Sequence, residues 1–277
     1  MTNIVLISRP RFWLYIFGPY IVGVAAGASS PSDFIRFDTL LFGLYFLLPA
    51  NLLVYGINDI FDFETDRLNP KKVEYEMLVR PENHRALWIW IAVLNVPFLL
   101  AAAFLATASL PLLIAFILLS IFYSAPPIRA KEVSFLDSIF NVLYVFPGAF
   151  AYQLLSDEFP MPVVFLAGGL WTAAMHAYSA IPDIGPDTAA GVNTIATKLG
   201  SWGTHLFCLV CYGVAGLVGG TLFAPLPLFG LFYVALMRFS SHETNRRSVF
   251  SVYRWFPLIN AIAGFVLFWT VAATKFF

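Results

Sequence analysis

The residues best suited to chemistry form an acidic row at the end of an apolar stretch, NDIFDFETD at residues 58–66. On a helix, Asp59, Asp62 and Asp66 share one stripe because they are spaced i, i+3, i+7, and Asn58 lies one turn before Asp62. Like charges at this spacing repel, and charges at a membrane boundary are costly, so the stripe needs a compensating cation. Its oxygen ligands favour Mg²⁺, which typically takes one or two carboxylates plus substrate phosphates. The alternative is a solvated helix end that marks the membrane surface.

A second acidic pair, Asp183 and Asp187, follows a later apolar stretch. The two acids are four residues apart, but Pro182 and Pro186 are expected to prevent a regular helix between them. Alone, the pair would suit a capped turn as well as a metal site. Its position on the same side of the membrane as the first row favours two Mg²⁺ ions that clamp one diphosphate. The predicted metal ligands are Asn58, Asp59, Asp62, Asp66, Asp183 and Asp187, and the predicted catalytic residues among them are Asp59, Asp62, Asp183 and Asp187.

Basic and phenolic residues lie near both acidic clusters in the sequence. Arg and Lys suit phosphate oxygens, and Arg binds them in a bidentate way. The bias of Lys and Arg toward cytoplasmic loops would place bases here in any case, and Tyr123 could equally anchor a helix at the interface. With both interpretations open, the candidate diphosphate-binding residues are Arg67, Lys71, Tyr123, Arg129, Lys131 and Lys198.

Four further polar residues are expected to line a cavity inside the apolar stretches. Asn51 and Tyr55 continue the face of Asn58 inward, and they could instead bond to neighbouring helices. His176 lies two turns before Asp183, with Ser179 between them. For His176 the alternative is a packed histidine that is hydrogen-bonded within the bundle.

The composition identifies the elements that must position these residues. Of the 277 residues, 60% are apolar and 12% are charged, against roughly 45–50% and 25% in soluble domains. So few charges exclude an ordinary soluble enzyme, and the high hydrophobicity excludes a disordered chain. The 16 basic and 16 acidic residues balance, so no nucleic-acid partner is indicated, and two cysteines cannot form a disulfide framework. The chain is therefore expected to be an all-α, polytopic protein of the lipid bilayer.

A membrane helix needs about 20 mostly apolar residues. Nine stretches approach this length, although the fourth and eighth are short and Pro111, Pro225 and Pro227 blur their ends. The predicted spans are Arg11–Ala28, Leu40–Ile60, Ala86–Ala106, Leu110–Tyr123, Phe135–Leu155, Pro162–Ile181, Thr204–Gly220, Leu222–Met237 and Trp255–Thr274.

The distribution of basic residues predicts the orientation. With nine spans and a cytosolic N-terminus, the inner segments hold 14 of the 16 Lys and Arg residues, and the outer ones hold only Arg36 and Lys275. The C-terminus is then external. The long inner loops place the chemistry on the cytoplasmic face of the cell membrane, and the lack of linkers or repeats predicts a single domain over residues 1–277.

These motifs resemble those of the UbiA-type superfamily of intramembrane prenyltransferases. The family's first motif is similar to Asn58-Asp59-x-x-Asp62-x-x-x-Asp66, and its tyrosine segment to Tyr123-Ser124-x-Pro126-Pro127-x-Arg129-x-Lys131. Two departures are present. Pro127 stands where many members have a lysine, so the basic role passes to Arg129 or Lys131, and Ser179 stands where the second motif usually has its first acid.

Two short segments are similar to the carotenoid-elongating branch, the lycopene elongases. They are SRPRFW at residues 8–13 and SAIPDIGPDTAAG at residues 179–191. The resemblance implies a nine-helix bundle around a central cavity open to the cytosol. It also implies Mg²⁺-dependent transfer of a prenyl group, expected to be dimethylallyl, from a prenyl diphosphate to lycopene or a related polyene.

The sequence leaves two alternatives open. One is an aromatic or tetrapyrrole acceptor, as in quinone, heme or chlorophyll pathways. The other is a cation-coupled transporter, which the position of the acids at span ends disfavours because transporter sites usually lie near the bilayer midplane.

Overall fold

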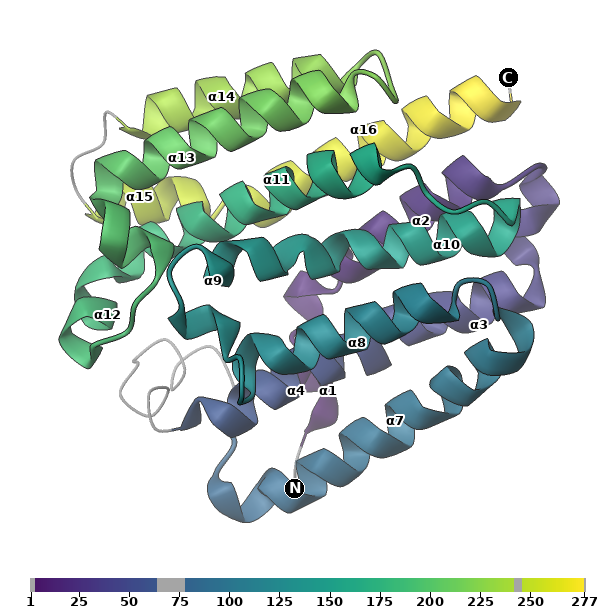
Figure 1. The fold of residues 1–277 in the computed structure, drawn as a ribbon, viewed down its shortest axis with the longest axis horizontal. Helices are drawn as coiled ribbons and strands as arrows, with labels where there is room; N and C mark the ends of the chain where they lie inside the picture. Colours follow the sequence, from purple (N-terminus) through teal and green to yellow (C-terminus); the bar gives the residue numbers. More distant parts are fainter. Residues whose placement is uncertain (1–2, 64–77, 242–245, 277) are drawn as a thin grey trace. The chain divides into compact units, whose positions relative to one another are not determined.

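The computed structural model describes residues 3–63, 78–241 and 246–276, and in that part of the chain it contains helices and no strand (Figure 1). The predicted all-α class is therefore confirmed. The chain forms two compact units. Unit 1 consists of residues 1–128, 146–159 and 264–277, and unit 2 of residues 129–145 and 160–263.

Unit 1 is a bundle of apolar helices in which α2 packs on α10, and α4 packs on α7 and α8 (Figure 1). Its core is aromatic: the Phe150 ring lies 4.8 Å from Phe42 and 5.6 Å from Phe46, and all three side chains are fully buried. The helices of unit 1 are α1 (Ile4–Ile7), α2 (Leu14–Gly27), α3 (Phe37–Leu47), α4 (Pro49–Phe61), α7 (His84–Leu105), α8 (Leu110–Ser124), α10 (Phe146–Ser156) and the end of α16 (Phe256–Phe276). Short 3₁₀ turns cover Pro10–Phe12, Pro31–Ile35 and Pro81–Asn83.

Helices α2 and α10 approach so closely that their backbones touch. A Cβ atom added at Gly23 would lie 2.1 Å from the carbonyl oxygen of Gly148. Small residues permit such contacts between membrane helices, where close packing replaces the hydrophobic effect as a source of association. This contact fixes α2, which carries the N-terminal segment that reaches the first acidic cluster.

Unit 2 is built on α11, which packs against α13, with α14 on the other side of α13 (Figure 1). Buried polar groups join the three helices: the Tyr178 and Ser240 hydroxyls are 2.6 Å apart, and His205 Nε2 lies 3.2 Å from Ser240 Oγ. The elements of unit 2 are η4 (Ala130–Glu132), α9 (Leu136–Ile139), η5 (Phe140–Val145), α11 (Pro162–Ala180), η6 (Ile181–Asp183), α12 (Ile184–Ala190), α13 (Ile195–Gly219), α14 (Leu226–Ser241), α15 (Arg246–Tyr253) and the start of α16.

Each of the nine predicted stretches contains helix, but several are interrupted. The second is split into α3 and α4 at Pro49, because proline lacks the N–H that would continue the helix. The fifth runs through α9, a 3₁₀ segment and α10, and the seventh begins earlier than predicted, at Ile195. Among the described residues, six helical segments are long and apolar enough to cross a membrane, and α8 and α14 are shorter apolar helices. The count of nine crossings stays a prediction.

Candidate active site

The first acidic cluster lies where α4 ends. The helix stops at Phe61, so Asp62 is its C-terminal cap, and its backbone N–H still bonds the carbonyl of Asn58. The Asn58 side-chain amide donates to Asp62 Oδ2 at 2.7 Å. Asp59 is only 4% exposed and Asp62 is 7% exposed. Two carboxylates and one amide are thus brought together at a buried helix end, as their spacing indicates.

Arg9 is a member of this cluster that the sequence analysis did not identify. Its guanidinium lies 2.7 Å from Asp59 Oδ1, and 4.7 Å from the centre of the Tyr55 ring. Arg9 adopts a left-handed backbone conformation, with φ of 51°, at the turn between α1 and the 3₁₀ turn that precedes α2. The compensating cation that the acidic stripe requires is therefore supplied, for Asp59, by the protein itself. The feature of the sequence that could have identified Arg9 is a basic residue directly before the first apolar stretch.

The tyrosine segment meets this cluster from α8. The Asn58 amide also donates to Ser124 Oγ at 3.2 Å, and Ser124 is fully buried at the end of α8. Tyr123 precedes it and is half-buried. The two motifs, separated by about sixty residues in sequence, are therefore joined within unit 1 by one side-chain amide.

The predicted cavity residues of unit 1 have different surroundings. Tyr55 lies under the Arg9 guanidinium, next to the acids. Asn51 is fully buried, and its amide donates to the carbonyls of Phe46 and Leu47 at 3.2 and 2.6 Å. Those carbonyls lie at the break before Pro49, so the Asn51 amide stabilises the junction of α3 and α4.

The second acidic pair lies in unit 2, on η6 and α12. The expectation that Pro182 and Pro186 prevent a regular helix is wrong, because α12 runs from Ile184 to Ala190 and includes Asp187. Pro186 falls in the first turn of α12, where backbone N–H groups have no partner inside the helix, and a proline there removes nothing. Asp183 is the residue before α12, and both acids are half-buried.

Asp137 is a second functional candidate that the sequence analysis did not identify. It is fully buried at the start of α9, and its Oδ2 accepts the backbone N–H of Ile195 at 2.8 Å. His176 Nε2 lies 3.7 Å from the same oxygen. The Ser179 hydroxyl donates to the carbonyl of His176 at 2.7 Å, so it is bonded within α11. The feature of the sequence that could have identified Asp137 is an acidic residue two positions inside an apolar stretch.

The predicted diphosphate-binding residues that the structure describes in unit 2 have different surroundings. Arg129 forms an ion pair with Glu132 at 2.7 Å, Lys131 is half-buried nearby, and Lys198 Nζ lies 5.5 Å from the centre of the Phe135 ring. Asp66, Arg67 and Lys71 lie outside the described residues. Within the described part of the chain, no three His, Cys, Asp or Glu side chains gather as a metal-binding group. Protein carboxylates there provide only part of a coordination shell, which suits an ion that shares its ligands with phosphate oxygens.

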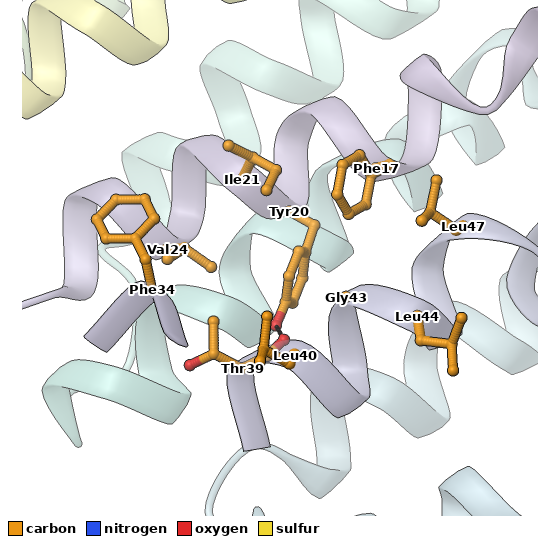
Figure 2. Close-up of a pocket in the computed structure, with 10 residues that line it drawn as sticks. All are labelled: Phe17, Tyr20, Ile21, Val24, Phe34, Thr39, Leu40, Gly43, Leu44 and Leu47. Carbon is orange, nitrogen blue, oxygen red and sulfur yellow. Dashed lines mark hydrogen bonds between the residues drawn. The ribbon is translucent and has the colours of Figure 1, made fainter. Parts of the chain in front are cut away.

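Unit 1 also contains an apolar hollow of about 240 Å³. Figure 2 shows Tyr20 crossing it from α2, with its hydroxyl directed at the Thr39 carbonyl of α3. Its remaining lining is hydrocarbon and aromatic, and none of the predicted cavity residues contributes to it. This hollow is therefore distinct from the cavity that the sequence predicts.

Comparisons with known proteins agree with the motifs. The UbiA prenyltransferase family profile matches residues 16–260. A lycopene elongase/hydratase of Haloferax volcanii is 39% identical, over 96% of this chain and 87% of its own length. A lycopene elongase/hydratase of Halobacterium salinarum is 40% identical, over 94% of both chains.

Solved structures show the same fold. A UbiA homolog from Archaeoglobus fulgidus bound to GPP and Mg²⁺ superposes with a TM-score of 0.74 at 19% identity, covering 98% of this chain and 100% of that one. The same homolog bound to DMAPP and Mg²⁺ gives a TM-score of 0.73, over 98% and 99% of the two chains, also at 19% identity. With the family profile covering most of the chain, the chain belongs to the UbiA prenyltransferase family and is a prenyltransferase.

Proposed function

We propose that the protein transfers an allylic prenyl group, the five-carbon dimethylallyl group, from its diphosphate to the end of lycopene or a related polyene. The observation that carries this proposal is the buried group of Asn58, Asp59 and Asp62 at the end of α4, hydrogen-bonded to the tyrosine segment. The acceptor class is supported by relatives named lycopene elongase/hydratase at about 40% identity.

The donor set fits Mg²⁺. Asp59, Asp62 and the Asn58 carbonyl offer oxygen ligands only, and such ligands favour a hard ion over a soft one. Asp183 and Asp187 are proposed as the second set of ligands, on the strength of their sequence motif. When bound, Mg²⁺ would neutralise charge on the diphosphate and so assist its departure.

The residues near the acids have separate roles in this proposal. Arg9 holds Asp59 in one orientation through its ion pair at 2.7 Å, and the face of the Tyr55 ring packs against the Arg9 guanidinium. Tyr123 and the basic residues Arg129, Lys131 and Lys198 are proposed to contact the diphosphate oxygens. Fixed cations of this kind stabilise the charge that develops on a leaving group.

The carbocation that forms when the diphosphate leaves must be protected from water. A site among apolar helices excludes water, and aromatic faces stabilise a cation by about 0.5–2 kcal/mol each. Helices of membrane-spanning length in both units are consistent with an integral membrane protein. We propose one catalytic domain with nine crossings, a cytosolic N-terminus, an external C-terminus and a cavity open to the cytosolic side of the cell membrane.

The test is product analysis with purified protein in lipid vesicles. Dimethylallyl diphosphate, lycopene and Mg²⁺ are supplied, and pyrophosphate release is measured together with the mass of the carotenoid product. Pyrophosphate release coupled to a carotenoid heavier by five-carbon units is expected. Pyrophosphate release without any change in the carotenoid would reject the polyene as acceptor, and prenylation of an aromatic or tetrapyrrole compound supplied in place of lycopene would establish the rival.

A further inference from the structure

We infer that His176, supported by Asp137, accepts the proton that is released when the prenylated acceptor becomes a neutral product. This inference rests on the proposed prenyl transfer to a polyene. It assigns a base to a reaction that must lose one proton and for which the metal-binding motifs supply no proton acceptor.

Asp137 is an ionisable group placed where a charge is costly. It is fully buried in unit 2, and its two oxygens accept backbone N–H groups: Oδ1 that of Ser138 at 2.9 Å, and Oδ2 that of Ile195 at 2.8 Å. Ile195 is the first residue of α13, where the partial positive charge of the helix terminus favours a carboxylate. These contacts hold the Asp137 carboxyl group in one place.

His176 is the basic group that this carboxylate faces. Its Nε2 lies 3.7 Å from Asp137 Oδ2. The His176 side chain is 20% exposed, whereas Asp137 is not exposed at all. The pair therefore has one partly exposed member and one fully buried member that supports it, as an oriented general base requires.

The position of His176 along α11 suits the site of proton loss. His176 precedes Asp183 by seven residues, four of them within α11 and three in the 3₁₀ turn η6, and this helical path returns Asp183 to a similar face. The rise is about 12 Å, at about 1.5 Å per α-helical residue and about 2.0 Å per 3₁₀ residue. This distance accommodates the diphosphate, the five-carbon group and the terminal carbons of the acceptor, so the base lies beside the acceptor rather than beside the leaving group.

One proton is released whether the product gains a new double bond or adds water. The terminal double bond of the acceptor forms a bond to the first carbon of the allylic group, whose bond to diphosphate oxygen breaks with its electron pair. The acceptor is left as a tertiary cation. Either an adjacent C–H bond breaks and its electrons form a new double bond, or water adds and an O–H bond breaks. In each case one proton moves to the His176 nitrogen that does not face Asp137, and it later leaves to solvent.

The experiment measures the coupling between two products in the same vesicles, pyrophosphate and elongated carotenoid. The variants are His176→Gln, which keeps polarity and approximate size, and His176→Ala, which leaves space. In both, pyrophosphate release is expected to stay within about 10-fold of the wild type, while carotenoid formed per pyrophosphate falls by about 10²-fold, the low end of the effect of a general base. Added imidazole should restore coupling in His176→Ala and not in His176→Gln.

The matched control is His84→Gln, a histidine in unit 1 whose ring nitrogen contacts the Val79 carbonyl at 3.2 Å, and it should remain coupled. Unchanged coupling in both folded His176 variants would overturn the inference and identify the diphosphate as the proton acceptor. Absence of pyrophosphate release from the wild type is a different result, because it would reject the proposed prenyl transfer itself and the inference with it. Loss of coupling without rescue by imidazole would also overturn the inference, since a packing role predicts that outcome.

Discussion

Replacing Arg9 by Met should destabilise the protein by leaving a buried carboxylate without its cation. Arg9 lies 2.7 Å from Asp59, whose side chain is 4% exposed, while the Arg9 side chain is 13% exposed. At this separation and an effective dielectric of about 20, the attraction between the charges is about 6 kcal/mol. Desolvation offsets part of it, and removal of one partner from a buried pair typically costs 3–5 kcal/mol. Because Arg9 keeps some contact with solvent, we expect a loss of about 3 kcal/mol.

The measurement is denaturant unfolding in detergent, without added divalent ions, for Arg9→Met, Asp59→Asn and the double variant. The double variant should be more stable than Arg9→Met alone, because the neutral amide no longer needs a cation. The matched control is Arg36→Met, which removes an equally short ion pair to Asp38, at 2.6 Å, whose arginine is 44% exposed. That change should cost less than about 1 kcal/mol. Additive effects of the Arg9 and Asp59 changes, or equal losses for Arg9→Met and Arg36→Met, would refute the reasoning.

Three further predictions concern the site and its scaffold. Asp62→Ala should lower the rate of prenyl transfer by about 10²-fold or more, comparable to loss of one oxyanion-hole donor. The control Asp38→Ala, which removes a more exposed ion pair, should keep an activity near that of the wild type. Equal activity of the two folded variants would contradict the placement of Asp62 in the active site. Chelation of divalent ions should abolish turnover and added Mg²⁺ should restore it, whereas activity that survives exhaustive chelation would rule out the proposed ion. Gly23→Ala should destabilise the protein by about 1–3 kcal/mol, because the new Cβ atom would lie 2.1 Å from the Gly148 backbone. The control is Gly18→Ala on the same helix, where a Cβ atom would meet no atom within 4 Å, and it should be neutral or stabilising in thermal unfolding. Equal stabilities of the two variants would show that α2 and α10 separate without cost.

Local features of the sequence predicted much of the fold. Long apolar stretches must satisfy their backbone groups internally in a membrane, so helices were expected and helices are present. The spacing of Asn58 and Asp62 predicted their contact, because residues four apart on a helix are neighbours. The breaks were harder to predict. Pro49 is the first residue of α4 and Pro186 lies in the first turn of α12, so both prolines mark the start of a helix, where spacing alone predicted an unbroken span and an irregular segment.

Contacts between distant residues could not be predicted from spacing. Arg9 and Asp59 are 50 residues apart, and Asp137 and Ile195 are 58 apart. Both pairs form because a charge inside an apolar bundle must find a partner, but the sequence does not say which one. Arg9 looked like an ordinary cytosolic base, and Asp137 like one residue of an apolar stretch.

The central claim is that this protein attaches prenyl groups to a polyene, and one measurement tests it most directly. Purified protein in lipid vesicles is given isotopically labelled dimethylallyl diphosphate, lycopene and Mg²⁺, and the extracted pigments are analysed by mass spectrometry. The account predicts labelled carotenoids that carry one and then two five-carbon units, with or without added water, and none when Asp62 is replaced by Ala. Unlabelled lycopene recovered intact from protein that releases pyrophosphate would contradict it.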